Sequence, residues 1–222
     1  MRILAEVQGC RQTAGGAHLL RFEGGFRFLP GQNVNLAVSP DGPVRSYSLA
    51  SGAGDSWAEV LFDLVPAGAL TPRLAALNAG DRLYVSPPFG GFLDREGPAT
   101  WVAAGTGVAP FASMVRSGLT ADKILVHSAR VPEGLHFRAL FAPRLGPRYF
   151  PCCPGEAGAD GVHDGVRYGV HYGGLRAWLR ESHLPPERRY LLCGSARMVV
   201  EVREALIQRG VPFGNIVAEI YF

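Results

Sequence analysis

Short apolar stretches with turn residues between them fill the first 95 residues of the chain. The stretches are 3–7, 18–22, 33–38, 46–50, 58–65 and 82–85. Gly and Pro clusters separate several of them, as at Pro30-Gly31 and Pro87-Pro88. Short strands at this spacing are typical of a small antiparallel barrel. One helix is predicted over 70–77, because apolar residues recur there at 70, 74 and 77.

The pattern changes after residue 99, where apolar strands begin to alternate with helical segments. Predicted strands are 101–104, 123–127, 189–193 and 216–220, and predicted helices are 110–116, 132–141, 174–181 and 196–209. This alternation predicts a parallel sheet with helices on both faces. A long loop is predicted before the 174–181 helix, with 152–166 at the surface because they are rich in Gly, Pro and Asp.

These patterns predict a two-domain protein. Residues 1–96 would form an antiparallel β-barrel, and residues 97–222 an α/β domain with a parallel sheet. The polar, turn-rich residues 94–98 are the expected junction. A chain of 222 residues is long enough for two modest domains, and a hydrophobic content of 47% excludes wholesale disorder.

Charge and cysteine content exclude several classes of function. The net charge is +3, and Lys123 is the single lysine among 22 basic residues. This excess of basic over acidic residues is too small and too scattered along the chain to indicate nucleic-acid binding. Cys10, Cys152, Cys153 and Cys193 show neither a disulfide framework nor metal-ligand spacing. We find no charged and apolar leader and no long apolar run. We therefore expect a cytoplasmic protein without a membrane span or a metal.

The motif Arg45-Ser46-Tyr47-Ser48 is the first candidate site. Strand alternation places Arg45 and Tyr47 on one face, with Ser46 and Ser48 on the other. An Arg fork can bind a pyrophosphate, a Tyr ring can stack on a flavin, and a Ser hydroxyl can hydrogen-bond a flavin nitrogen. The alternative is an ordinary strand that carries an exposed arginine.

The segment Leu70-Thr71-Pro72 is the second candidate. Thr71 could cap a short helix with its hydroxyl, with Pro72 at the first helical position. Free N–H groups at a helix start can bind phosphate. The alternative is simply a well-formed helix start.

Three further candidates lie in the second half. Gly105-Thr106-Gly107 follows a strand and opens a helix, the order expected of a nucleotide loop, although Pro110 stands where a dinucleotide fingerprint has its third Gly. Ser128 and Arg130 follow the next strand and could bind a ribose phosphate, or form a polar loop. Cys193-Gly194 ends another strand, where the thiol could face a nicotinamide or be a buried structural cysteine.

The last two residues, Tyr221 and Phe222, follow a predicted strand. Chain ends are usually polar and frayed, so a terminal aromatic pair suggests that something flat is covered there. We hypothesise that a flavin lies between Tyr47 and these rings. The alternative is a strand end that caps a core.

The order and spacing of these motifs resemble the ferredoxin/flavodoxin–NAD(P)H reductase family, in its compact bacterial type. The resemblance runs along the whole chain, through Pro30-Gly31-Gln32, Arg45-Ser46-Tyr47-Ser48, Leu70-Thr71-Pro72-Arg73-Leu74, Gly105-Thr106-Gly107, Ser128-Ala129-Arg130, Cys193-Gly194 and Glu219-Ile220-Tyr221-Phe222. It implies an FAD-binding barrel followed by an NAD(P)-binding α/β domain whose aromatic tail returns to the flavin.

The resemblance also implies site residues. FAD would be bound by Arg45, Ser46, Tyr47, Ser48, Phe62, Leu64, Val65, Leu70, Thr71, Tyr221 and Phe222. NADP or NAD would be bound by Gly105, Thr106, Gly107, Ser128, Arg130, Cys193, Gly194 and Met198. The catalytic group would be Ser48, Cys193, Glu219 and Tyr221. Tyr221 would have to move aside for the nicotinamide, and Glu219 would relay a proton or orient Ser48.

The expected electron partner is a ferredoxin or a flavodoxin, and the protein is expected to be a monomer. Family members that prefer NADP bring more than one basic residue to the 2′-phosphate. Arg130 matches one, but Gly155 and Val170 stand where others are expected. NADPH and NADH therefore both remain open, as do the acceptor and the physiological direction.

Two other functions are compatible with these residues. One is a NAD(P)H:flavin reductase or an oxygenase-reductase module on the same fold, although the four cysteines cannot form the cluster motif that often accompanies the latter. The other is a non-enzymatic flavin-binding electron-transfer subunit, against which the set Ser48, Cys193 and Tyr221 argues.

Overall fold

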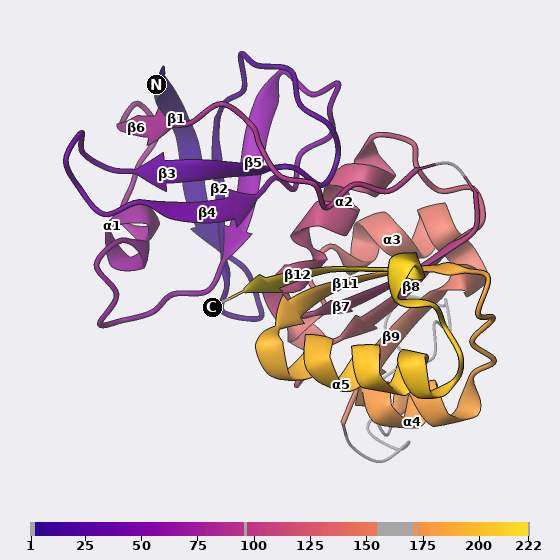
Figure 1. The fold of residues 1–222 in the computed structure, drawn as a ribbon. Helices are drawn as coiled ribbons and strands as arrows, with labels where there is room; N and C mark the ends of the chain where they lie inside the picture. Colours follow the sequence, from indigo (N-terminus) through magenta and orange to yellow (C-terminus); the bar gives the residue numbers. More distant parts are fainter. Residues whose placement is uncertain (1–2, 96, 155–170, 173, 222) are drawn as a thin grey trace. The chain divides into compact units, whose positions relative to one another are not determined.

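The structure is a computed structural model that describes residues 3–95, 97–154, 171–172 and 174–221. The chain divides into two compact units. The first consists of Met1–Asp94 together with Ala109–Leu119, and the second of Arg95–Val108 together with Thr120–Phe222. Figure 1 shows the elements along the chain. Within the described residues, no helix is long and apolar enough to cross a bilayer.

The first unit is a six-stranded antiparallel barrel in the strand order β4-β3-β6-β1-β2-β5. Its strands are β1 (Ile3–Gln12), β2 (His18–Glu23), β3 (Asn33–Ala37), β4 (Arg45–Ser48), β5 (Trp57–Phe62) and β6 (Arg82–Val85). An isolated bridge between Leu49 and Val60 connects the two outer strands. The Ala50 N–H also donates to the Glu59 carbonyl at 2.7 Å. The predicted barrel is thereby confirmed.

Alternating apolar residues build the core of this barrel. Leu20 and Phe22 of β2 and Val34 and Leu36 of β3 are fully buried and belong to one cluster. Strand β1 runs five residues beyond the prediction, because an irregularity between Val7 and Gly9 shifts its register and interrupts the alternation on which the prediction relied.

The first unit also contains two helices. Helix α1 (Thr71–Ala75) is shorter than predicted and buries Leu74. Helix α2 (Ala109–Arg116) follows the Gly105–Val108 turn of the second unit but packs with the barrel. The rings of Phe111 and Phe92 meet edge to face at 5.6 Å.

The second unit is a six-stranded, entirely parallel sheet in the order β10-β9-β8-β7-β11-β12. Its strands are β7 (Ala99–Ala104), β8 (Lys123–Ser128), β9 (Tyr149–Cys153), β10 (His171–Tyr172), β11 (Arg189–Ser195) and β12 (Ile216–Tyr221). Its helices are α3 (Arg138–Leu145), α4 (Gly174–Glu181) and α5 (Ala196–Gln208), with 3₁₀ turns at Gly105–Val108, Pro132–Gly134, Gly146–Arg148 and Phe213–Asn215.

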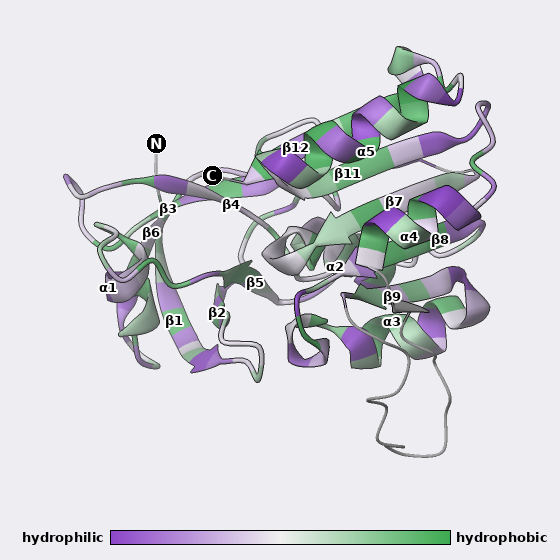
Figure 2. Ribbon diagram, turned by 90° about the horizontal axis from the view of Figure 1, so that it is seen from below, coloured by the Kyte–Doolittle hydropathy of each residue, from purple (hydrophilic) through white to green (hydrophobic). Residues whose placement is uncertain are grey.

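Helices cover both faces of this sheet, as predicted. Val102, Val126 and Leu192 share a cluster with apolar residues of α4 and α5, so these two helices lie on one face. On the other face, Phe141 of α3 meets Tyr149 with ring centroids 5.6 Å apart. Figure 2 shows the same layering in hydropathy, with apolar colour along β7 and β11 and mixed colour along α4 and α5.

Two predicted elements of the second unit were wrong. The 132–141 helix is instead a 3₁₀ turn and α3, because Phe137 has a positive φ of 58° between them. The predicted long loop contains β9 and β10, and Cys152 and Cys153 are buried strand residues. Their Gly- and Pro-rich neighbours hid the strand. The part of the predicted loop from 155 to 166 lies outside the described residues.

A neutral histidine lies in the core of the second unit. His127 of β8 is fully buried and its Nδ1 lies 3.2 Å from the Tyr149 hydroxyl. The pKa of His127 is lowered from 6.5 to about 3, mainly by burial and also by the nearby His136, while a backbone hydrogen bond to Gly105 opposes the shift. In the unfolded chain the same imidazole takes up a proton near its ordinary pKa.

This difference predicts an acid-sensitive fold. Because the folded pKa is depressed, the contribution of His127 is present above pH 6.5 and is lost as the pH falls toward 3. Between pH 7 and 5 it should cost about 2 kcal/mol of unfolding free energy. Urea denaturation at both pH values should show a smaller loss for His127→Gln than for the wild type. Equal losses would contradict the assignment.

Candidate functional site

The predicted nucleotide residues meet at the carboxyl edge of the parallel sheet. Ala103 of β7 pairs with His127 of β8 on one side and with Cys193 of β11 on the other, and Cys193 pairs with Glu219 of β12. The segments that follow these positions are the Gly105–Val108 turn, Ser128–Arg130, Gly194 and Tyr221. Ligands of open α/β sheets bind at this edge, so the fold places four separate predicted segments together.

Gly105 and Gly107 of the Gly105–Val108 turn are required for different structural reasons. Gly105 has a φ of +55° and no atom near the place of a side chain, so it serves the turn itself. Gly107 lies directly against β11. A Cβ there would collide with the Cys193 carbonyl oxygen and stand 2.6 Å from its carbonyl carbon. The close approach of the two backbones therefore requires glycine at position 107.

Cys193, Glu219 and Tyr221 lie on one face of the sheet. Cys193 and Glu219 are register partners in adjacent parallel strands, and Tyr221 follows Glu219 by one strand repeat. Burial raises the pKa of the Cys193 thiol well above its ordinary value, Glu219 raises it further, and a hydrogen bond from Tyr221 lowers it. The thiol is thus neutral at physiological pH and is not a thiolate nucleophile.

The junction between β11 and α5 lies at this carboxyl edge and is closely packed. Gly194 has a φ of +150°, and a Cβ there would lie 2.8 Å from the Met198 Cε. The Ser195 hydroxyl caps α5 by accepting from the Met198 N–H at 3.4 Å. Met198 itself is 8% exposed and packs in the core below α5. Ser195 was not among the predicted site residues, although a Ser directly before a helical stretch is a recognisable capping signal.

Ser128 and Arg130 flank a buried residue. Ala129 donates its N–H to the Cys152 carbonyl at 3.0 Å and is 8% exposed. Ser128 is half-buried and Arg130 is exposed on either side of it. A hydroxyl and a guanidinium in this position offer hydrogen-bond donors and positive charge to an anion that approaches the carboxyl edge.

The motif Arg45-Ser46-Tyr47-Ser48, which was predicted to bind a flavin, forms β4 of the first unit. Tyr47 pairs with the core residue Val34 of β3, and its ring meets Phe62 edge to face at 5.9 Å. Ser46 lies opposite Asn35 and donates a hydrogen bond to its Oδ1 at 2.6 Å. The predicted alternation of this strand is therefore present. Asn35 was missed, because only the cross-strand register brings it to Ser46.

Burial and charge differ along β4. Arg45 and Ser46 are exposed, Tyr47 is half-buried and Ser48 is 3% exposed. The Arg45 guanidinium donates to the Val44 carbonyl at 2.8 Å. Burial raises the pKa of Tyr47 to about 12, against a smaller lowering by Arg45. Tyr47 is thus a neutral aromatic side chain beside a cation.

The Thr71 hydroxyl has a different partner from the predicted one. It accepts from the Val65 N–H at 3.0 Å and donates to the Val65 carbonyl at 3.2 Å. Leu70, not Thr71, is the N-cap of α1, without a side-chain cap bond, and Pro72 is the second helical residue. The capping prediction was wrong, because the loop from Val65 to Thr71 closes on itself before the helix starts.

The remaining predicted flavin residues are divided by burial. Phe62 and Leu70 are 3% exposed and belong to the barrel core. Leu64 and Val65 are 40% and 53% exposed, so their side chains are accessible to a ligand. Phe222 lies outside the described residues, as do Gly155 and Val170.

The donor set of the first unit fits a flavin nucleotide. It offers an exposed guanidinium at Arg45, an aromatic ring at Tyr47 and exposed apolar side chains at Leu64 and Val65. The second unit offers a Gly turn at a carboxyl edge and a neutral thiol, which fits a nicotinamide nucleotide. No group of three or more His, Cys, Asp or Glu side chains in the described part of the chain could hold a metal ion.

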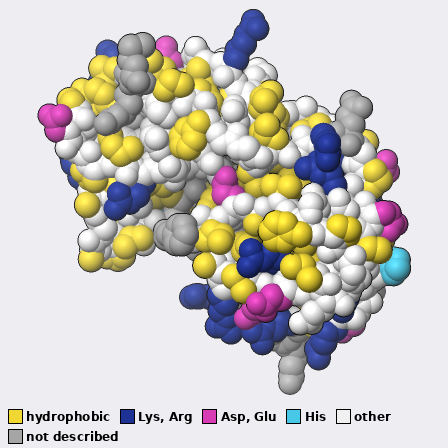
Figure 3. Space-filling model, in the orientation of Figure 1, with side chains coloured by type: hydrophobic (Ala, Val, Ile, Leu, Met, Phe, Trp, Pro, Cys, Tyr) yellow, Lys and Arg dark blue, Asp and Glu magenta, His cyan; other side chains and the backbone are white. Residues whose placement is uncertain are grey.

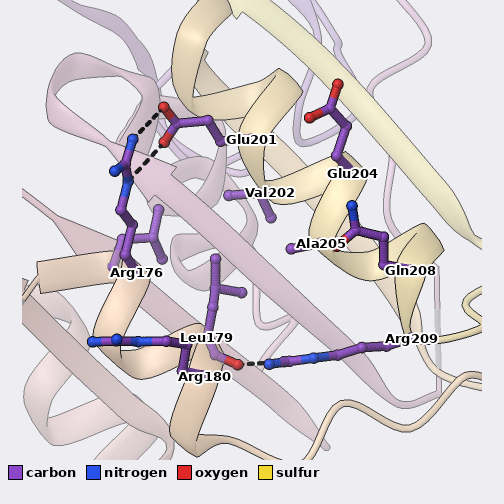
Figure 4. A pocket seen from close by; sticks show the side chains of 10 residues that line it. Arg176, Leu179, Arg180, Glu201, Val202, Glu204, Ala205, Gln208 and Arg209 are labelled. Carbon is purple, nitrogen blue, oxygen red and sulfur yellow. Dashed lines mark hydrogen bonds and ion pairs between the residues drawn. The ribbon is translucent and has the colours of Figure 1, made fainter.

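A groove of about 670 Å³ lies elsewhere in the second unit, between α4 and α5. Figure 4 shows the Arg176–Glu201 ion pair on one side of it and the hydrogen bond from Arg209 to the Leu179 carbonyl on the other. None of the predicted site residues lines this groove. It is therefore not part of the site described above.

Comparisons with known proteins place the chain. No protein-family model matches it. Ferredoxin–NADP reductase A of Sorangium cellulosum is 30% identical over 216 residues, covering 86% of this chain and 76% of that protein. The electron transfer component of toluate 1,2-dioxygenase of Pseudomonas putida is 38% identical over 91 residues, 40% of this chain and 27% of that one.

A solved structure agrees in fold. The ferredoxin NADP+ reductase from Neisseria gonorrhoeae with bound FAD and NADP superposes with a TM-score of 0.84 at 20% identity, covering 100% of this chain and 99% of that one. The resemblance inferred from the motifs is confirmed by the first relative, which matches across both units. The chain belongs to the ferredoxin–NADP reductase family.

Proposed function

We propose that this protein is an FAD-dependent oxidoreductase that passes electrons between a nicotinamide nucleotide and ferredoxin or flavodoxin. The observation that carries the proposal is the joint placement of the Gly105–Val108 turn, Cys193, Glu219 and Tyr221 at one carboxyl edge. Membership of the ferredoxin–NADP reductase family supports it. We assign FAD binding to residues 1–96 and nucleotide binding to residues 97–222.

The barrel residues would hold FAD by three kinds of contact. Arg45 would bind the pyrophosphate, since its guanidinium is exposed and donates in a fixed fork. Tyr47 would stack on one flavin face, with Ser46, Leu70, Thr71 and the backbone from Phe62 to Val65 along the ribityl and phosphate region. Ser48 would hydrogen-bond the flavin nitrogen that accepts hydride. Tyr221 and Phe222 would cover the other face.

The sheet residues would hold NADP or NAD. The backbone of Gly105, Thr106 and Gly107 would bind the phosphates, and Ser128 and Arg130 the ribose with any 2′-phosphate. Cys193 and Gly194 would border the nicotinamide, with Met198 supporting them from α5. A neutral thiol suits this task, because it packs against the ring without adding charge.

Bound FAD would supply the chemistry, since it accepts electrons in pairs and releases them singly. The residues of the chain would hold the flavin and the nucleotide in position and would hold or transfer a proton near the flavin. Glu219, the register partner of Cys193, would hold or relay a proton near Ser48 or orient it. Tyr221 would exclude water from the flavin until the nicotinamide displaces it.

The electron acceptor would dock by charge. Figure 3 shows basic side chains gathered over the part of the second unit where α5 runs, with Asp and Glu side chains among them. They are arginines, because the single lysine, Lys123, is buried. Acidic ferredoxins or flavodoxins would be steered by such a surface. We further propose that the protein acts as a monomer in the cytoplasm.

A reductase component of an oxygenase is the second candidate function. It is favoured by the 38% identity to the toluate 1,2-dioxygenase electron transfer component, although that match covers 91 residues. Such a protein would use the same flavin and nucleotide residues but deliver electrons to another acceptor. Reduction of ferredoxin, flavodoxin and an oxygenase component by the purified protein would distinguish the two functions.

The proposed function predicts a yellow protein. After incubation with FAD and gel filtration, the flavin should remain bound, and anaerobic addition of NADPH or NADH should bleach its absorbance. Comparing the two nucleotides in stopped flow measures the preference. A protein that stays colourless, or a bound flavin that neither nucleotide reduces, would refute the proposal.

Loss of the Tyr221 ring should tighten nucleotide binding. If the ring must be displaced, removing it abolishes that cost, and Tyr221→Ala should bind NADP+ about tenfold more tightly than the wild type. Tyr221→Phe keeps the ring and removes only the hydrogen bond to Cys193, so it is the matched control. Difference-absorbance titrations that show equal affinity for all three proteins would exclude a gate at this position.

Gly107 should tolerate no side chain. Gly107→Ala forces the turn away from β11, because its Cβ would collide with the Cys193 carbonyl oxygen. Nucleotide affinity should fall by about tenfold or more, since a displacement near 1 Å has costs of this size. FAD affinity should be unchanged. Gly214→Ala, in an open turn of the same unit, is the control. Nucleotide titrations in which the two variants bind equally well would contradict the prediction.

A further inference from the structure

A buried carboxylate connects α2 to the barrel. The Glu59 side chain of β5 is 1% exposed and has two arginine partners. Arg21 of β2 donates to Oε2 from Nε at 3.3 Å and from Nη2 at 3.0 Å. Arg116, the last residue of α2, donates to Oε1 from Nη1 at 2.8 Å. One arginine therefore comes from the barrel itself and the other from the helix.

The end of α2 also holds the segment that follows the flavin motif. The Arg116 Nη1 donates to the Ala50 carbonyl at 2.7 Å, two residues after Ser48. The Ala53 N–H donates to the Ser117 hydroxyl at 2.9 Å. A Cβ on Gly52 would lie 3.1 Å from the Arg116 Cβ, so the loop passes close to the helix. Three separate contacts thus fix the helix end to the residues beyond β4.

The other end of α2 is joined to the nucleotide turn. Ala109 begins the helix directly after the Gly105–Val108 turn, whose Gly107 lies against the Cys193 backbone. The turn belongs to the second unit and the helix to the first. A helix of eight residues is about 12 Å long and stiff, so its anchor at Arg116 restrains its first residue as well.

Burial of the Glu59 carboxylate indicates that the anchor serves geometry. The carboxylate is 1% exposed, while the side chains of Arg116 and Arg21 are 21% and 44% exposed. Removing a carboxylate from water is costly, and buried ion pairs contribute little net stability compared with apolar residues. Their directional bonds do fix one arrangement of the elements that carry them. Arg21 alone could neutralise Glu59, so the contact from Arg116 adds position rather than charge balance.

We propose that Arg116 and Glu59 are positioning residues that fix α2 on the barrel and thereby restrain the nucleotide turn that is joined to its first residue. The proposal rests on the proposed function and adds to it a pair of residues that touches neither nucleotide. The pair would set how firmly the nucleotide turn is held for nucleotide binding, while the flavin contacts of Arg45 to Ser48 remain as they are.

The test compares Arg116→Gln with Arg21→Gln. Each variant removes one of the two partners of Glu59, but only the first removes a contact of α2, so Arg21→Gln is the matched control. Both are reconstituted with FAD as full chains. Arg116→Gln should slow anaerobic flavin reduction by NADPH or NADH about tenfold and weaken the long-wavelength absorbance of nucleotide stacking. Arg21→Gln should stay within about twofold of the wild type. Arg116→Lys should recover part of the rate.

Hydrogen exchange gives a second measurement without cofactor. Amides of residues 105–115 should exchange about tenfold faster in Arg116→Gln and at the wild-type rate in Arg21→Gln. Equal effects of the two variants, or wild-type behaviour of Arg116→Gln, would overturn the proposal. If Arg116→Gln fails to fold, Ser117→Ala takes its place, because Ser117 accepts the other hydrogen bond at this end of α2. Amides of residues 105–115 should then exchange faster than in the wild type, and an unchanged exchange rate would overturn the proposal. A wild-type protein that binds no FAD would refute the proposed function. The hydrogen-exchange comparison needs no cofactor, so it would still test the positioning role of Arg116 and Glu59.

Discussion

Parallel pairing of β11 with both β7 and β12 is the constraint on which the candidate site depends. The register aligns Ala103, Cys193 and Glu219 across three strands that are distant in sequence. Because all six strands run in one direction, the turns that follow them emerge at one edge. A slip of one residue in β12 would turn Glu219 and Tyr221 to the opposite face from Cys193.

Close backbone contact at this edge gives the glycines their role. Gly107 lies against the Cys193 carbonyl, and Gly194 lies against the Met198 and Ala104 side chains, so neither position has room for a side chain of its own. The thiol of Cys193 is held in a buried environment that keeps it neutral. The edge therefore combines closely packed glycine backbone with a neutral thiol.

Helix α2 belongs to a different structural unit from the sequence motif in which it lies. In sequence it belongs to the strand–turn–helix motif of the α/β half, yet its aromatic and charged side chains pack with the barrel. The bond from Arg116 to Glu59 and its bond to the Ala50 carbonyl explain this association. The chain crosses between units directly after the Gly105–Val108 turn. Substitutions in α2 should therefore be interpreted through both units.

Local pattern alone determined much of this protein. Alternating apolar residues with Gly and Pro between them predicted the six barrel strands, and the change to strands alternating with helical segments predicted the parallel sheet. Both predictions succeed because the repeat of a strand or a helix is visible in residues that are close in sequence. The motifs around Arg45, Gly105, Cys193 and Tyr221 identified the family from residue types at fixed positions.

Tertiary structure decided what depends on distant partners. It showed that Cys152 and Cys153 belong to a buried strand, that the Thr71 hydroxyl bonds Val65 instead of capping α1, and that α2 packs with the barrel. It also paired Ser46 with Asn35 and Arg116 with Glu59. None of these contacts leaves a periodic signal, because each joins residues whose separation along the chain is set by the folded backbone rather than by the repeat of a helix or a strand.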